Sequence, residues 1–85
     1  MSTITIPITF TDLEKMEKWY ADFDNNARNI CKKYNVPELW EKTIIQKDNE
    51  KMELAIVSFG TCVSGSNKEK AENEIIRVFE SMYFS

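Results

Sequence analysis

The sequence predicts an α+β fold, a two-layer sandwich in which two helices pack on one face of a three-stranded sheet. Three observations support it. Residues 3–10 alternate between apolar and polar side chains, as in a half-buried strand. Residues 13–34 repeat apolar side chains at helical spacing, and residues 43–60 hold two strand-like runs around a polar turn. With a second helical repeat after residue 66, the expected order is β-α-β-β-α, in a mostly antiparallel sheet.

The first strand is expected at an edge of the sheet. Pro7 falls within it, and proline has no amide proton to donate to a neighbouring strand. A central strand needs donors on both sides, so this strand has a neighbour on one side only. Its predicted inward face consists of Ile4, Ile6, Ile8 and Phe10.

The first helix is predicted to begin at a capping box, in which Thr11 accepts a backbone hydrogen bond and Glu14 reaches back. It is predicted to end at Asn35, because Pro37 drives Val36 out of the helical region of backbone conformation. Its apolar stripe consists of Leu13, Met16, Tyr20, Phe23, Ala27, Ile30, Cys31 and Tyr34.

A single helical turn over residues 37–40 leads into the hairpin. Its strands are predicted over residues 43–47 and 51–60, with a turn at residues 48–50. Residues 54–57 are apolar on both faces, which is typical of a central strand. A central third strand and an edge first strand together predict the sheet order 1-3-2. The last helix should turn Ala71, Ile75, Val78, Phe79 and Met82 inward.

Length and composition predict one ordered domain over residues 1–85. Fourteen acids against eleven scattered bases give a net charge of −3, which makes nucleic acid an unlikely partner. No apolar run approaches the ~20 residues of a membrane span, and the first residues do not resemble a signal peptide. We therefore expect a cytoplasmic protein in which Cys31 and Cys62 remain thiols.

Several kinds of chemistry are disfavoured, so we expect no enzyme, metal or cofactor. The chain has no histidine, which excludes the common nucleophile pairs with that residue. It also has no Cys-x-x-Cys spacing for zinc. The segment from Asp22 resembles the start of a calcium loop, but Ala27 and Lys33 stand where glycine and glutamate are required.

A loop with two glycines, Gly60 and Gly65, separates the hairpin from the last helix. We expect Gly60 to end the strand, Gly65 to supply a positive φ and Ser66 to cap the helix, in a second capping box with Glu69. The alternative is a small-ligand, nucleotide or anion site formed by the helix N-terminus. Its residues would be Gly60, Gly65, Ser66 and Lys68, and the reactivity of Cys62 stays an open question.

Aromatic residues at the margins of a small core favour protein binding as the function. We expect a non-catalytic, acidic protein-binding module that inhibits or regulates a larger protein. A chain of this character is typical of the small proteins that phages direct against host or defence proteins. The expected partner-binding residues are Trp19, Asp22, Glu38, Trp40 and Tyr83.

Two further possibilities follow from the open face of the sheet. An RNA-binding module would need stacking aromatics on that face, and the threonines of the first strand make this the lowest-ranked function. Ala55, Val57 and Phe59 are predicted to make the face partly apolar, so a homodimer formed through this face, or through the edge strand, is also predicted.

Overall fold

A computed structural model of the chain describes residues 4–61 and 65–84, and it confirms the predicted α+β architecture. The strands form one antiparallel sheet in the order β1-β3-β2, as expected from the sequence. The predicted single turn before the hairpin is present as a short helix. In chain order the elements are β1 (Ile8–Thr9), α1 (Leu13–Lys33), α2 (Pro37–Glu41), β2 (Ile44–Asp48), β3 (Glu53–Ser58) and α3 (Gly65–Phe84).

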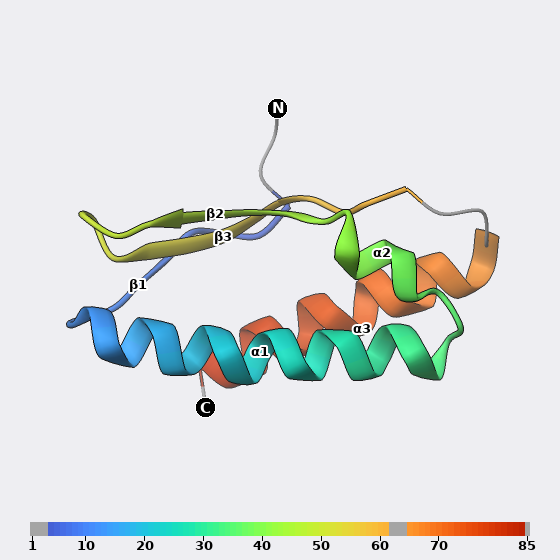
Figure 1. Ribbon diagram of the computed structural model, residues 1–85, viewed down its shortest axis with the longest axis horizontal. Helices are drawn as coiled ribbons and strands as arrows, with labels where there is room; N and C mark the ends of the chain where they lie inside the picture. The colour runs from blue at the N-terminus through green and yellow to red at the C-terminus, as the bar shows by residue number, and fades with distance from the viewer. Residues whose placement is uncertain (1–3, 62–64, 85) are drawn as a thin grey trace.

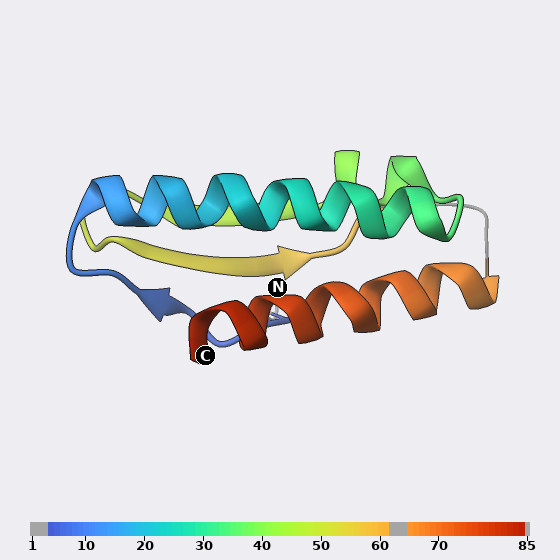
Figure 2. The same cartoon turned by 90° about the horizontal axis from the view of Figure 1, so that it is seen from below.

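The sheet forms one layer of the molecule, and α1 and α3 form the other (Figure 1). The two long helices run antiparallel and lie side by side, and the last turns of α3 lie beside the chain around β1 (Figure 2). Both long helices therefore cover the same face of the sheet, as predicted. The core between the layers consists of Ile8, Met16, Phe23, Ala27, Ile30, Cys31, Val36, Leu39, Trp40, Leu54, Ile56, Ala71, Ile75 and Phe79.

The start of α1 differs from the prediction by one residue. Asp12, and not Thr11, is the N-cap, and its carboxylate accepts a hydrogen bond from the Lys15 amide at 2.9 Å. Asp12 has an extended backbone, with φ −153° and ψ 157°, which is the usual conformation of a cap. A carboxylate at this position also interacts favourably with the positive end of the helix dipole.

The end of α1 is a Schellman motif built on Asn35, which confirms the predicted end. Asn35 has φ 59°, a left-handed conformation that asparagine tolerates better than most residues. The Asn35 amide donates to Lys32 O at 3.1 Å, and the Val36 amide donates to Cys31 O at 2.8 Å. Pro37 then begins α2, at a position where a missing amide proton is harmless.

The regular part of β1 is much shorter than the predicted strand over residues 3–10. Its ladder with β3 covers only Ile8 and Thr9, and the predicted position at the edge of the sheet is confirmed. Pro7 directly precedes this ladder. Regular pairing begins only after it, because on the other side of Pro7 the Ile56 amide donates to the Thr5 hydroxyl and not to a backbone carbonyl.

In the segment before Pro7, the side chain predicted to point outward is buried, and those predicted to point inward are exposed. The amides of Ile4 and Thr5 both donate to Ile56 O, at 2.9 and 3.3 Å, while the Thr5 hydroxyl accepts from the Ile56 amide at 2.8 Å. The Thr5 side chain thus takes the place of a backbone acceptor and is buried. Ile4 and Ile6 are exposed as a result, and their predicted inward orientation is wrong.

The hairpin is confirmed, with boundaries shifted by a few residues. The Asp48 carboxylate accepts hydrogen bonds from the amides of Glu50 and Lys51, at 3.0 and 3.1 Å, and so stabilises the turn. Met52 completes the reversal in a left-handed conformation with φ 55°. Residues 54–56 are all buried, as expected for the central strand of the sheet.

The sheet face that points away from the helices is less apolar than predicted. Ala55 lies on it and is buried, and Val57 is half-buried. Gln46 is the neighbour of Ala55 in the register and adds a polar side chain. Phe59 lies beyond the end of β3 and packs against the core, so its predicted place on the open face is wrong. A homodimer formed through this face stays a prediction.

The helix α3 buries the face that the sequence predicted. Ala71, Ile75 and Phe79 are buried, and Val78 and Met82 pack against the core from its margin. These positions recur every three or four residues, which places them in one stripe along the helix. The helix therefore packs on the core from Ala71 onward.

The two loop glycines have different roles from those predicted. Neither has a positive φ, and Gly65 is already the first residue of α3, so Ser66 lies inside the first turn and is not the cap. Gly60 is buried where the end of β3 approaches α2. A Cβ atom there would lie 2.4 Å from Lys42 Cβ and 2.6 Å from Leu39 O. Close packing, and not backbone conformation, requires glycine at this position.

Replacing Gly60 with alanine is expected to lower the free energy of unfolding by about 1–3 kcal/mol, because the backbone after α2 must move. Urea denaturation followed by circular dichroism measures the change. The matched control is Gly65→Ala, whose Cβ meets nothing within 4 Å and which should raise stability by at most about 1 kcal/mol. Equal stability of the two variants would contradict the packing role of Gly60.

Candidate functional site

An apolar groove lies between the chain around β1 and the last turns of α3. Its volume is about 400 Å³. One wall is the segment of residues 5–8, and the other is a single face of α3, because residues 79, 80, 83 and 84 are neighbours on a helix surface. Figure 2 shows these two segments next to each other. The lining residues are Thr5, Ile6, Pro7, Ile8, Phe79, Glu80, Tyr83 and Phe84.

Two large apolar side chains at the groove are strongly exposed. Ile6 is 83% exposed and Phe84 is 75% exposed, more than any other large apolar residue in the described ranges 4–61 and 65–84. Single exposed apolar residues are common on protein surfaces, but a contiguous apolar patch is typical of an interaction site. The groove and its two exposed side chains form such a patch, which we call the β1–α3 groove.

The helical wall of this groove is held by aromatic contacts. Phe79 is 3% exposed and belongs to the core. Tyr83 is half-buried, with its ring 6.2 Å from that of Phe10 and 5.0 Å from that of Phe84, both in edge-on geometry. The Tyr83 hydroxyl also donates to Thr9 O at 3.4 Å. The end of α3 is therefore joined to the edge strand by a side chain that the sequence singled out for binding.

The outer edge of β1 offers few backbone partners for another strand. The Phe10 amide donates to Met52 O, so by the alternation of an antiparallel ladder Ile8 also turns its backbone toward β3. Thr9 then turns its amide and carbonyl outward, and its carbonyl already accepts from Tyr83. Pro7, the next outward residue, has no amide proton. Addition of a strand at this edge is poorly supported.

Trp40 does not lie at a binding surface, so its expected exposure is wrong. It is only 5% exposed, and its indole Nε1 donates to Asp24 Oδ1 at 2.8 Å. Its ring meets Phe23 edge to face at 5.5 Å. Asp24 also accepts from Arg28 Nε at 2.9 Å. The short α2 carries Trp40 into the core, and no pattern in the sequence indicated its contact with Asp24.

Trp19 is half-buried within the same aromatic group. Its ring stacks on Phe23 at 5.3 Å and stands perpendicular to Phe79, also at 5.3 Å. The indole Nε1 is buried and has no hydrogen-bond partner within the described part of the chain. Trp19 therefore turns most of its surface toward the core.

The structure does not bring the predicted partner-binding residues together on one surface. Asp22 is exposed on α1, and Glu38 is half-buried on α2. Only Tyr83 of the predicted set lines the β1–α3 groove. Sequence reasoning missed Ile6, because the alternation pointed it inward, and it did not single out Glu80.

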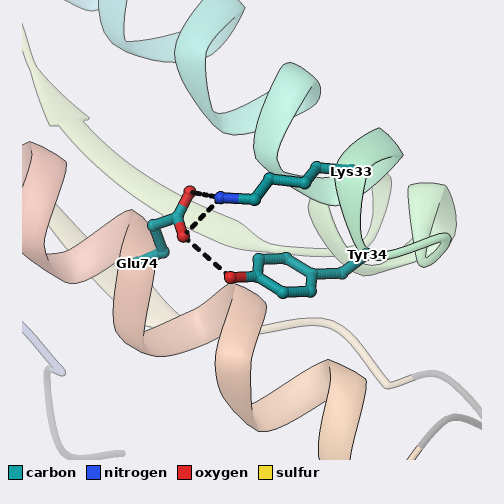
Figure 3. Close-up of polar contacts among 3 residues, drawn as sticks. All are labelled: Lys33, Tyr34 and Glu74. Atoms are coloured by element: carbon teal, nitrogen blue, oxygen red, sulfur yellow. Dashed lines mark hydrogen bonds and ion pairs between the residues drawn. The ribbon is translucent and has the colours of Figure 1, made fainter.

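A second cluster joins the end of α1 to α3 (Figure 3). The Glu74 carboxylate accepts from Lys33 Nζ, at 3.1 and 3.2 Å to its two oxygens, and from the Tyr34 hydroxyl at 2.9 Å. Lys33 Nζ also lies 5.1 Å from the centre of the Tyr34 ring. The sequence held no signal for these partners of Glu74, which are about 40 positions away.

The charges of this cluster indicate a structural role. The pKa of the Glu74 carboxyl is lowered, mainly by the hydrogen bond from Lys33 and then by that from Tyr34. The pKa of the Lys33 ammonium is raised, mainly by its hydrogen bond to Glu74. Both groups thus stay charged across the neutral range. A general base or a nucleophilic amine needs the opposite shift.

The geometry around the glycine loop does not favour an anion site. Gly60 is buried against α2, and Gly65 and Ser66 lie in the first turn of α3. Lys68 Nζ is 3.1 Å from the Glu72 carboxylate, which neutralises the charge that an anion would need. Cys62 lies outside the described residues, as does any contact it makes with Cys31, which is buried in the core.

Residues 4–61 and 65–84 contain neither a cluster of metal ligands nor a membrane-spanning helix. No group of three or more cysteine, aspartate or glutamate side chains comes together there in a way that would hold a metal ion. None of the helices in these ranges combines the length and the apolar character needed to cross a bilayer.

Comparisons with known protein families, with curated proteins and with solved structures found no match to this chain.

Replacing Trp40 with alanine is expected to lower the free energy of unfolding by about 3–5 kcal/mol, because a buried ring and its hydrogen bond are both lost. Trp40→Phe keeps much of the packing and should be less destabilising. Urea denaturation of both variants measures the difference. A fully stable Trp40→Ala protein would contradict the core position.

The Glu74 carboxyl is expected to titrate with a midpoint below 4.5, the ordinary value. Because its pKa is lower in the folded chain, its contact stabilises the fold above about pH 4.5 and is lost as the pH falls through the folded pKa. Carbon-detected NMR of the side-chain carboxyl measures the midpoint. Lys33→Met should raise it more than Tyr34→Phe does. An unchanged midpoint in Lys33→Met would show that the ion pair is absent in solution.

Proposed function

We propose that this chain is a non-catalytic protein-binding module that docks through the β1–α3 groove. The observation that carries the proposal is the exposure of Ile6 and Phe84 on either side of an apolar groove. In this proposal the chain works in the cytoplasm as an inhibitor or regulator of a larger protein. The other predicted function, binding of a small anion at the glycine loop, has no comparable support.

The energetics of the groove support association with another macromolecule. Burying an exposed side chain the size of Ile6 or Phe84 contributes about 1.5–3 kcal/mol each. Association itself opposes binding by about 4–15 kcal/mol, so these two anchors need the rest of the groove to reach a useful affinity. Rigid aromatic anchors at the centre of an interface are typical of binding hot spots.

The groove is better suited to binding than to catalysis. Its lining is apolar apart from the Thr5 and Tyr83 hydroxyls and the Glu80 carboxylate. Lys33 and Glu74, whose pKa values are shifted, do not line it, and both shifts favour the charged form. A catalytic site needs several converging polar groups. The mostly apolar lining of this groove is better suited to burying side chains of a partner.

Site-specific photocrosslinking tests the proposal. With p-benzoylphenylalanine at position 84, a covalent adduct with one partner protein is expected in cells of the source organism, because this side chain would be buried on docking. The matched control carries the crosslinker at Ile44, an apolar residue of β2 that is 48% exposed and does not line the groove.

Adding Ile6→Asn should abolish the adduct at position 84 while the fold stays intact, since Ile6 is largely exposed. Its effect on the free energy of unfolding should be within about 0.5 kcal/mol. Adducts of equal yield at positions 44 and 84, or an adduct that survives Ile6→Asn, would overturn docking through this groove.

A further inference from the structure

We infer that the occupant of the β1–α3 groove is a basic amphipathic helix of the partner protein. The inference rests on the proposed function, and it specifies the chemistry of the partner. Two properties of the groove lead to it: the small number of backbone partners along its strand wall, and a single acidic side chain in an otherwise uncharged lining.

The backbone of the edge strand selects against an extended segment. A peptide that adds to a sheet depends on a row of outward amides and carbonyls. Here Pro7 has no amide proton, and the Thr9 carbonyl already accepts from the Tyr83 hydroxyl at 3.4 Å. A helix satisfies its own backbone hydrogen bonds, so it can fill the groove with side chains and needs nothing from this edge.

The charge of the groove selects for a basic partner. Glu80 is its one charged lining residue, and it forms no ion pair within residues 4–61 and 65–84. By contrast, Glu72 and Glu74 on the same helix are already paired with lysines. A lysine or arginine about one turn from the apolar anchor of a docked helix would meet Glu80 beside an apolar surface, where a charged hydrogen bond is strong. The net charge of −3 also steers basic partners toward the chain.

The same charge disfavours a second copy of this chain as the occupant. Glu80 and Phe84 are four residues apart on α3 and therefore lie on the same face of the helix. If Phe84 of one copy filled the groove of another, its own Glu80 would approach the Glu80 that lines that groove. Two carboxylates would then be brought together beside an apolar surface, which opposes the contact.

A selection from a displayed library of amphipathic helices tests the inference. The library has a fixed leucine and phenylalanine stripe and randomised flanking positions, and binders are counter-selected against the Ile6→Asn, Phe84→Ser double variant. We expect the surviving helices to carry lysine or arginine about one turn from the stripe. Their affinity should fall about five- to tenfold for Glu80→Gln and should weaken with salt. The matched control, Glu69→Gln, removes the same charge from an exposed position about three turns earlier on α3 and should leave affinity unchanged.

Three outcomes would overturn the inference. The first is a set of groove-dependent helices without basic enrichment, or with equal affinity for Glu80→Gln, which would leave protein binding through the groove in place. The second is a dimer in sedimentation that Phe84→Ser dissociates, which would make a second copy the occupant. The third is the absence of any groove-dependent helix. In that case the crosslink at position 84 decides whether the proposed function fails as well.

Discussion

The packing of Phe23 is the contact on which the rest of the structure depends. This side chain is 1% exposed, and its ring lies 5.3 Å from Trp19, 5.5 Å from Trp40 and 5.2 Å from Phe79. One residue of α1 thus touches aromatic rings from all three helices. Aromatic pairs favour particular relative orientations, so these contacts determine the position of α3 along the axis of α1. The position of Phe79 in turn decides where the last turn of α3 presents Phe84.

Polar contacts hold the margins of this aromatic core. Asp24 joins α1 to α2 through Trp40, and Glu74 joins α1 to α3 through Lys33 and Tyr34. Partly exposed contacts of this kind contribute little stability individually. Their value is geometric, because each one favours a single alignment of two helices. The shifted pKa values of Lys33 and Glu74 are therefore explained by contacts that hold the fold together.

Both edges of the sheet are protected against pairing with other strands. At the β1 edge, Pro7 removes a donor and Tyr83 occupies a carbonyl. At the β2 edge the register shifts between Ile44 and Ile45, and Lys47 turns toward α1, where it meets Glu17 at 3.8 Å. A bulge and an inward charge both hinder pairing at a sheet edge. Strand addition is therefore disfavoured at both edges.

The elements and their order could be predicted from the sequence alone. Local signals were enough for this, because Pro7 places the first strand at an edge, residues 54–57 require a central position, and Asn35 ends the long helix. Which apolar side chains stay exposed depends on contacts that form only in the folded chain. Periodicity shows that an element has an apolar face, but it cannot show which residue finds a partner. Trp40 is buried and Ile6 exposed because of contacts between distant segments, such as the hydrogen bond that joins residues 51 positions apart. The groove follows from those contacts, so no local pattern could have predicted it.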